Sequence, residues 1–273
     1  MPVETQQRTI SAKRIAVEGF RNYSECEVCP ATGFNIVCGQ NAQGKTNLLE
    51  SLMLVATGRL LRPGRDVQAI QHGQDHARLK AVLTGSGTSI GIEIRRGARK
   101  RAFLNEASLP RPSDLLGRLP VVSFTANDLE IVRGEPADRR HFLDAELAQL
   151  YPAYLRALSV YKRSLDQRNA LLKASQTAHV LDEEFEPWEE KLAQHGKEIR
   201  QFRQTWVAEL APRVADAHRE LGAGEVLDIA YDQRDSDDLF STLSESRFLD
   251  VRRGTTSCGP HRDELTILVA ATD

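Results

Sequence analysis

The spacing of hydrophobic positions divides the chain into a mixed α/β part and a helical part. In the N-terminal half, short apolar runs bounded by Gly, Pro and polar residues predict strands. Gly85-Ser86-Gly87 and Gly97-Ala98 separate the three central runs, which predicts an antiparallel meander. The predicted strands lie at residues 12–17, 34–38, 77–84, 89–95, 101–104 and 119–124.

A different periodicity begins after Pro136, where apolar residues recur at three-, four- and seven-residue spacings. Such spacing places apolar side chains on one face of a helix. It predicts a helix at 138–150 and two longer amphipathic helices, at 154–172 and 188–221, that pack antiparallel. The aromatic residues in these stripes are expected to pack in the helical core rather than to stack on bases.

The second long helix carries two unusual features. Asp and Glu side chains crowd residues 182–190, and this acidic stretch is expected to solvate the turn and to start the helix. Gly196 and Pro212 lie further along and are expected to weaken or kink the helix, because both are poor helix formers.

These patterns together predict an α/β protein with a helical block inserted into it. Strand patterns return after Gly222, at 226–231 and 265–269, and a helical stretch at 236–251 lies between them. We therefore expect a first α/β lobe, a helical lobe and a return to the first lobe. The three parts are residues 1–134, 135–222 and 223–273.

Composition narrows the class of protein only slightly. A chain of 273 residues can bury one or two cores, and its formal net charge of −2 favours no particular partner. No run approaches the roughly 18 apolar residues that a membrane span needs. The first seven residues lack the apolar region of a secretory signal, so we expect a cytoplasmic protein without a membrane partner.

The most specific motif is a phosphate-binding loop with the spacing G-x-x-x-x-G-K-[ST]. The apolar residues 34–38 before it predict a buried strand, and residues 47–56 after it predict a helix that ends near Gly58. Strand, glycine loop and helix in this order are the context of a nucleoside triphosphate site. The predicted nucleotide-binding residues are Gly39, Gln40, Asn41, Ala42, Gln43, Gly44, Lys45 and Thr46.

The residue types in the loop suit ATP and Mg²⁺. Gly39 and Gly44 let the backbone approach phosphate oxygens, while the loop N–H groups and the helix N-terminus present positive partial charge. Lys45 is expected to reach the β- and γ-phosphates, and the Thr46 hydroxyl to ligate Mg²⁺. Asn41 can tolerate a left-handed backbone inside the loop.

Basic residues outside the loop have two readings each. Arg21 and Asn22 either contact nucleotide phosphate or ribose, or only form a turn. A second group follows the loop helix and either contacts DNA phosphates or forms a solvated surface; a basic cluster at 95–101 presents the same choice. The second group consists of Arg59, Arg62 and Arg65.

Other candidate residues favour structural roles. Cys26 and Cys29 have C-x-x-C spacing, but no second pair or nearby histidine completes a zinc site. Arg140 and Asp144 are four apart on a predicted helix and are expected to pair. His261 follows Pro260 at a strand entry and is expected to be structural.

Hydrolysis needs an acidic residue pair at the end of an apolar strand, to hold Mg²⁺ and orient water. No segment of the 273 residues fits this pattern. We therefore expect that the chain is a fragment or has lost this element, and the sequence leaves ATP hydrolysis undecided.

Several separated segments together resemble the RecF family, whose ATPase head is of the ABC or SMC type. The match is collinear over essentially the whole chain. The combination of the Asp-Arg-Arg-x-Phe-Leu-Asp, Lys-Arg-x-Leu-x-Gln-Arg-Asn and Gly-Pro-His-Arg-Asp segments makes it specific. The matching segments are residues 18–23, 46–50, 58–59, 135–144, 162–172 and 259–265.

The resemblance implies a P-loop ATPase head with an antiparallel β subdomain and an inserted helical lobe. It implies DNA binding at duplexes and at single-strand/double-strand junctions, and loading of RecA at gaps with RecO and RecR as partners. It also implies ATP-dependent homodimerisation and weak DNA-dependent ATP hydrolysis, within DNA replication, recombination, the DNA damage response and the SOS response.

Two other functions are compatible with the residues. One is a P-loop phosphotransferase that acts on a small molecule without any dependence on DNA. The other is a non-hydrolysing module that binds DNA or RecR. The effect of duplex DNA on nucleotide turnover would separate these from a DNA repair ATPase.

Overall fold

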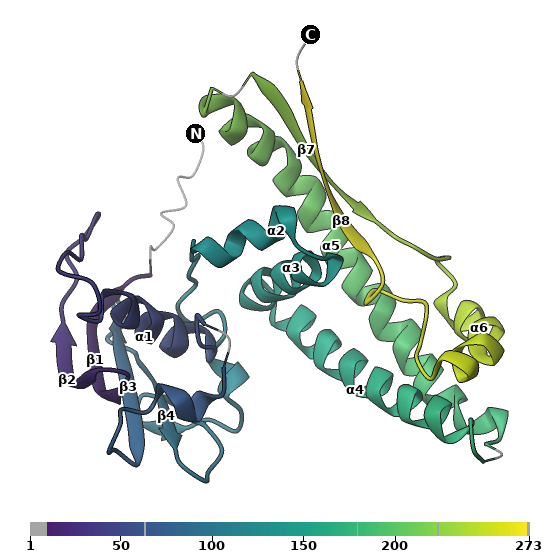
Figure 1. Cartoon of the computed structure of the whole chain (residues 1–273), viewed down its shortest axis with the longest axis horizontal. Coiled ribbons are helices and arrows are strands. Elements are labelled where there is room, and N and C mark those ends of the chain that lie inside the picture. The colour runs from purple at the N-terminus through teal and green to yellow at the C-terminus, as the bar shows by residue number, and fades with distance from the viewer. Residues whose placement is uncertain (1–9, 63, 179, 223, 272–273) are drawn as a thin grey trace. The chain divides into compact units, whose positions relative to one another are not determined.

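The computed structural model describes residues 10–62, 64–178, 180–222 and 224–271. The chain divides into two compact units, residues 1–123 and 124–273, each of which is described separately (Figure 1). The first seven residues, on which the expectation about a secretory signal rests, lie outside the described residues. The three-part division at residues 134 and 222 stays a prediction.

The first unit is built on a sheet in which every paired strand is antiparallel. The spatial order is β2-β1-β3-β4-β5-β6. The meander predicted from the sequence is confirmed, since β3, β4 and β5 end within a residue of the predicted bounds. The strands are β1 (Ala12–Phe20), β2 (Tyr23–Val28), β3 (His76–Leu83), β4 (Ser89–Arg95), β5 (Arg101–Leu104) and β6 (Ala107–Ser108).

One face of this sheet and the helix α1 (Lys45–Thr57) form the core of the first unit. Alternate residues of the strands, such as Val17 and Leu79, point into it and are buried, as the two-residue period of a strand requires. Leu54 of α1 is fully buried against them, which contributes about 2 kcal/mol relative to an exposed side chain. Two short 3₁₀ helices complete the unit, η1 (Asp66–Ala69) and η2 (Pro112–Leu115).

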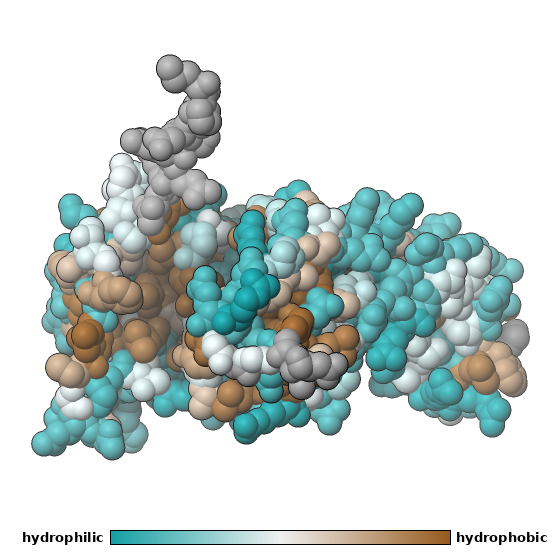
Figure 2. Space-filling view, turned by 90° about the horizontal axis from the view of Figure 1, so that it is seen from above, coloured by the Kyte–Doolittle hydropathy of each residue, from teal (hydrophilic) through white to brown (hydrophobic). Residues whose placement is uncertain are grey.

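The strands predicted at 34–38 and 119–124 do not form in the described chain. Neither segment is paired with a described strand, and Phe34 and Val122 are 103% and 88% exposed. The Asn35 side chain instead bonds to the backbone of Ala31 and Gly33 and holds a turn. An apolar run becomes a buried strand only where neighbours satisfy its N–H and C=O groups and cover its side chains. Apolar side chains interrupt the hydrophilic surface in the space-filling view (Figure 2).

Helices dominate the second unit, and the three predicted from the sequence periodicity are confirmed. The long helices α4 and α5 lie side by side and antiparallel (Figure 1), and the antiparallel pair of strands β7 and β8 packs on α5. No helix in the described part of the chain combines the length and the apolar character that crossing a membrane requires. The elements are η3 (Ala126–Leu129), α2 (Glu130–Arg133), α3 (Pro136–Leu150), α4 (Pro152–Ala174), η4 (Asp182–Glu184), α5 (Glu186–Glu220), β7 (Glu225–Asp232), α6 (Leu239–Arg253) and β8 (Glu264–Ala271).

The helix α5 runs through both Gly196 and Pro212, so neither residue ends it. Gly196 has a packing role instead. A Cβ atom there would lie 2.7 Å from a Leu239 methyl group and 3.4 Å from Tyr161. Glycine costs about 1 kcal/mol of helix propensity relative to alanine, and here it lets neighbouring elements approach α5 closely.

The acidic stretch 182–190 is not uniformly solvated, which corrects that expectation. Glu189 is fully buried, and its carboxylate accepts hydrogen bonds from Arg168 at 3.0 Å and Arg247 at 2.6 Å. Arg168 is also fully buried and donates to Asp250 at 2.8 Å. Charge density along the sequence does not reveal that one acid in this stretch faces an arginine on another helix.

Asp144 does not pair with Arg140, so that prediction is wrong. Its carboxylate instead accepts hydrogen bonds from the buried Arg203 at 2.8 Å and from Lys162 at 2.9 Å. Arg140 donates to the backbone carbonyl of Asp263. Burial alone would raise the pKa of Asp144, but Arg203 and Lys162 outweigh it and hold the pKa below its usual value.

Candidate nucleotide-binding site

The phosphate loop runs into the first turn of α1, and three of its residues have left-handed backbone. Gly39 and Gly44 have φ of 148° and 103°, and Ala42 has φ of 65°. The left-handed position expected at Asn41 therefore falls one residue later, on Ala42. In this conformation the Cβ atom lies close to the following carbonyl oxygen, so the loop holds Ala42 there at a cost of about 1–2 kcal/mol.

Gly44 is constrained by its neighbours as well as by its backbone. A Cβ atom on Gly44 would lie 2.7 Å from the amide of Asn22 and 2.9 Å from the hydroxyl of Tyr23. The Tyr23 hydroxyl donates to the Gly44 carbonyl at 3.2 Å. Burial, with a smaller contribution from Cys26, raises the pKa of Tyr23, so the hydroxyl keeps its proton. The turn between β1 and β2 thereby packs directly on the phosphate loop.

Lys45 folds over the loop rather than into an apolar interior. Its Nζ atom donates to the carbonyl oxygens of Gly39 and Gln40, each at 2.7 Å. The side chain is half-buried, and the next residue, Thr46, is exposed. The ammonium group thus lies at the mouth of the loop, where a phosphate oxygen could replace a carbonyl as its acceptor.

The N-terminus of α1 adds a favourable field for an anion. Gly44 is its N-cap, and no side chain caps it. The first N–H groups of an α-helix lack acceptors within the helix, and the aligned peptide dipoles place partial positive charge there. Lys45 and the exposed Thr46 are the first two residues of α1, so both begin at the end of the helix that favours an anion.

Arg21 and Asn22 form the two-residue turn between β1 and β2. Arg21 takes a left-handed φ of 54°, which costs about 1–3 kcal/mol for a residue with a side chain. Its guanidinium compensates by binding Glu50 through two parallel hydrogen bonds of 2.9 Å. Asn22 donates to the Gln43 carbonyl of the loop at 3.2 Å. Asn22 therefore lies against the loop and Arg21 against α1, and contact of either residue with a nucleotide stays a prediction.

The arginines after α1 are exposed but have different partners. Arg62 donates to Glu50 at 2.7 Å and to the side chain of Asn47 at 2.5 Å. Arg59 and Arg65 donate hydrogen bonds from their backbone N–H groups to Thr57 and Gln68, and both residues are exposed at the surface.

Glu50 is the residue that sequence reasoning missed at this site. Its side chain is fully buried on α1 and binds two arginines from separate segments. Burial by itself would raise the pKa of Glu50, but the hydrogen bonds from Arg21 and Arg62 outweigh it and lower the pKa. A carboxylate inside the apolar run of the loop helix was the available signal, because an unpaired charge is rarely buried.

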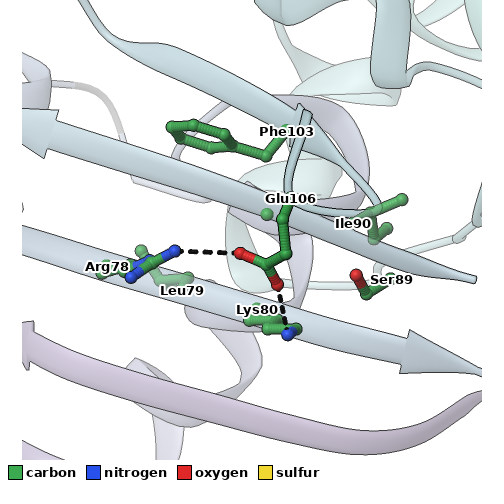
Figure 3. Close-up of a pocket in the computed structure, with 8 residues that line it drawn as sticks. Arg78, Leu79, Lys80, Ser89, Ile90, Phe103 and Glu106 are labelled. Carbon is green, nitrogen blue, oxygen red and sulfur yellow. Dashed lines mark hydrogen bonds and ion pairs between the residues drawn. The ribbon is translucent and has the colours of Figure 1, made fainter. Parts of the chain in front are cut away.

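A small hollow on the sheet does not form a ligand site (Figure 3). Glu106 holds Arg78 at 3.1 Å and also binds Lys80 there. The free volume is about 10 Å³, roughly enough for one water molecule. The wider hollow beside it is lined by four glutamates, among them Glu18 and Glu27, and by only two basic side chains, so this face favours no anionic polymer.

The basic cluster at 95–101 is largely occupied by contacts within the first unit. Arg95 pairs with Glu93, Lys100 with Asp66, and Arg96 donates to a backbone carbonyl. Arg101 lies over the ring of Phe103. The four cysteines are free thiols, and no group of three metal-binding side chains is found among the described residues.

The Gly-Pro-His-Arg-Asp segment of the second unit is locked by buried polar contacts. His261 Nδ1 lies 2.7 Å from the Tyr161 hydroxyl, and burial lowers the pKa of His261 to about 4. Arg200 binds the carboxylate of Asp263 at 2.7 Å. A neutral, enclosed histidine between two elements has a structural role, as expected from the sequence.

Comparisons with known proteins agree with one another. The family model of the AAA domain matches residues 14–205. The DNA replication and repair protein RecF of Agathobacter rectalis is 33% identical over 265 residues, which cover 96% of this chain and 73% of the relative. RecF of Thermosynechococcus vestitus is 36% identical over 266 residues, with 93% and 70% covered.

Similarity extends to solved structures. The recombination mediator protein RecF–ATP of the RecFOR pathway matches with a TM-score of 0.90 at 27% identity, over 97% of this chain and 74% of that chain. The Smc head bound to the C-winged helix domain of ScpA reaches 0.52 at 13% identity, over 96% of this chain and 68% of that one, which shows the fold alone. The fold is therefore that of a P-loop ATPase head of the ABC or SMC type, as the sequence predicts.

Proposed function

The chain belongs to the RecF family of DNA replication and repair proteins, and from this premise we propose that it binds ATP in the loop Gly39–Thr46 and acts in recombinational DNA repair. The observation that carries this proposal is that Lys45 folds over the loop at the uncapped N-terminus of α1, where the exposed Thr46 is the next residue. A triphosphate is the ligand whose charge matches that arrangement.

Each loop residue has a defined part in ATP binding. Gly39 and Gly44 supply backbone that lies close to phosphate oxygens, and Lys45 moves from the loop carbonyls to the β- and γ-phosphates. Thr46 offers a hard oxygen ligand, which suits Mg²⁺ together with phosphate oxygens and water. When bound, Mg²⁺ would neutralise part of the triphosphate charge.

The proposed role in the cell follows the family. The chain binds DNA at single-strand gaps and junctions, acts with RecO and RecR to load RecA, and forms a homodimer when ATP is bound. The similarity to a RecF–ATP structure of the RecFOR pathway supports this role. The exposed guanidinium groups of Arg59 and Arg65, close in sequence to the loop helix, support contact with DNA phosphates.

Binding of Mg·ATP to Lys45→Ala tests the proposal. We expect the variant to lose about 3 kcal/mol of binding free energy, or roughly a hundredfold in affinity, because a charge-assisted phosphate contact disappears. Titration calorimetry measures it, and Lys173→Ala, at an exposed lysine of the second unit, is the matched control. A Lys45→Ala variant that binds ATP as tightly as the parent would show that the site is elsewhere.

A further inference from the structure

A continuous chain of side-chain hydrogen bonds links the phosphate loop to the basic segment after α1. The Gln43 carbonyl accepts from Asn22 Nδ2 at 3.2 Å, and Asn22 Oδ1 accepts from Asn47 Nδ2 at 2.8 Å. Asn47 Oδ1 in turn accepts from the guanidinium of Arg62 at 2.5 Å. The β1–β2 turn is thus joined to the loop, to α1 and to the segment after α1 through two asparagine amides.

The groups at the two ends of this series of hydrogen bonds fix which atom donates and which accepts in every bond. A backbone carbonyl can only accept a hydrogen bond, and a guanidinium can only donate. Asn22 must therefore turn its NH₂ toward Gln43 and its oxygen toward Asn47, and Asn47 must turn its oxygen toward Arg62. Reversing either amide would break two bonds, so the chain has one arrangement that satisfies all members.

The two ends also differ in rigidity. Arg62 is held by Glu50, which is fully buried and also binds Arg21. Asn47 and Glu50 are three residues apart and lie on the same face of α1. The Gln43 end lies in an exposed loop, and its 3.2 Å bond is the longest in the chain. Movement of the loop therefore acts first on the longest hydrogen bond of the series, the one between Asn22 and Gln43.

We infer that Asn22 and Asn47 are positioning residues that report nucleotide occupancy of the loop to Arg62 and the segment 59–65. The inference rests on the proposed ATP site. A triphosphate draws Lys45 away from the carbonyls of Gly39 and Gln40, which frees the loop to move the Gln43 carbonyl. When Asn22 loses that acceptor, Asn47 is no longer held toward Arg62, and a guanidinium N–H becomes available to an anion such as a DNA phosphate.

Coupling of this kind is reciprocal, because the binding free energies of two linked ligands share one coupling term. A nucleotide that releases Arg62 must bind more tightly when DNA holds Arg62. The chain of amides is therefore a specific route by which the loop and the basic segment can affect each other within the first unit.

Hydrogen–deuterium exchange tests the inference in the full chain. The parent, Asn22→Ala and Asn47→Ala are compared with and without saturating Mg·ATP, so that any change in ATP affinity does not matter. In the parent, we expect Mg·ATP to change exchange in residues 59–70 by about fivefold, the lower range of allosteric coupling. Both variants should lose this nucleotide dependence.

A matched control is Gln71→Ala. It removes another side-chain amide bond in the first unit, from Gln71 to the Ser24 hydroxyl at 3.1 Å, outside the chain of asparagines. It should keep the response of the parent. Alanine replaces asparagine because an aspartate beside the phosphates would repel ATP by its charge. Asn22 is exposed in a turn, so its variant keeps the test valid if Asn47→Ala fails to fold.

The outcomes separate this inference from the proposed function. A parent that binds Mg·ATP without any change in the segment 59–70 overturns the coupling alone. So does an Asn47→Ala variant that keeps the full response. A parent that does not bind Mg·ATP overturns the ATP site itself, and the coupling with it.

Discussion

Gly44 shows how a single residue meets two separate constraints. Its φ of 103° is costly for any residue with a side chain, and a Cβ atom would collide with Asn22 and Tyr23. Gly73 has a similar φ of 83°, but nothing lies within 4 Å of its Cβ position. A comparison of alanine substitutions at Gly44 and Gly73 therefore separates the cost of backbone strain from the cost of steric collision.

We expect Gly44→Ala to lower the free energy of unfolding by about 1–3 kcal/mol more than Gly73→Ala, because overpacking adds to the strain that both share. Chemical denaturation measures the difference. Gly44→Ala should also weaken ATP binding, since relief of the clash displaces the loop. Equal destabilisation by the two substitutions would mean that the turn at Asn22 shifts away from the new Cβ atom at little cost in free energy.

Glu50 allows a prediction about pH. Its pKa is lowered in the folded protein from an ordinary value of 4.5, so the unfolded chain binds its proton more readily. The stability from this group is therefore fully present above about pH 4.5 and is lost as the pH falls through the folded pKa. Glu50→Gln cannot titrate and has no such contribution.

The free energy of unfolding of the parent should accordingly exceed that of Glu50→Gln by about 1–3 kcal/mol at neutral pH, since two charged hydrogen-bond partners lose their carboxylate. This gap should narrow below pH 4.5. Urea denaturation at a series of pH values checks both points. A gap that stays constant from pH 7 to pH 3 would contradict the assigned ion pairs.

At the scale of helices and strands, buried ion pairs tie the second unit together. Arg168 of α4 binds Glu189 of α5 and Asp250 of α6, and all three side chains are fully buried. Asn169 also accepts from the backbone and hydroxyl of Thr256. The Lys-Arg-x-Leu-x-Gln-Arg-Asn segment therefore joins three helices and a loop, and its contacts here are structural.

Arg168→Met should destabilise the protein by about 3–5 kcal/mol, because it leaves buried carboxylates without their cation. Arg219→Met is the control, since Arg219 forms an exposed pair with Asp216 and should cost less than about 1 kcal/mol. Thermal and urea unfolding measure both. A small effect of Arg168→Met would indicate that Arg247 alone can neutralise Glu189.

The elements that could be predicted from the sequence are those in which buried apolar residues recur at a regular spacing. The meander and α3, α4 and α5 bury one face, and that face is visible as a spacing of two or of three to four. The run at 34–38 has no described strand beside it, and apolar composition alone cannot supply one. Within the site, the motif predicted the loop, but the Glu50, Asn22 and Asn47 contacts depend on tertiary placement of the β1–β2 turn.

At the scale of the whole molecule, the phosphate loop and the segments most specific to the family lie in different units. The phosphate loop and its polar contacts lie in the first unit. The segments that make the family resemblance most specific lie in the second, where Arg168, Arg203 and Asp263 are buried in ion pairs. The segments that carry the family resemblance therefore have packing roles in this chain, and they do not identify the surface that contacts DNA.

Salt dependence provides that measurement for the segment after α1. If the exposed Arg59 and Arg65 each contact a DNA phosphate, the slope of log K against log salt for duplex DNA should become shallower by about 0.9 for each alanine substitution. Fluorescence anisotropy across a salt series measures the slope, with Arg219→Ala in the second unit as the control.

The effect of a phosphate contact is uniform across DNA sequences, because phosphates carry no sequence information. An unchanged slope in the double variant would move the DNA contact to another basic surface. Arg95 and Arg101 of the hairpin are weaker candidates, because Glu93 and Phe103 already engage them.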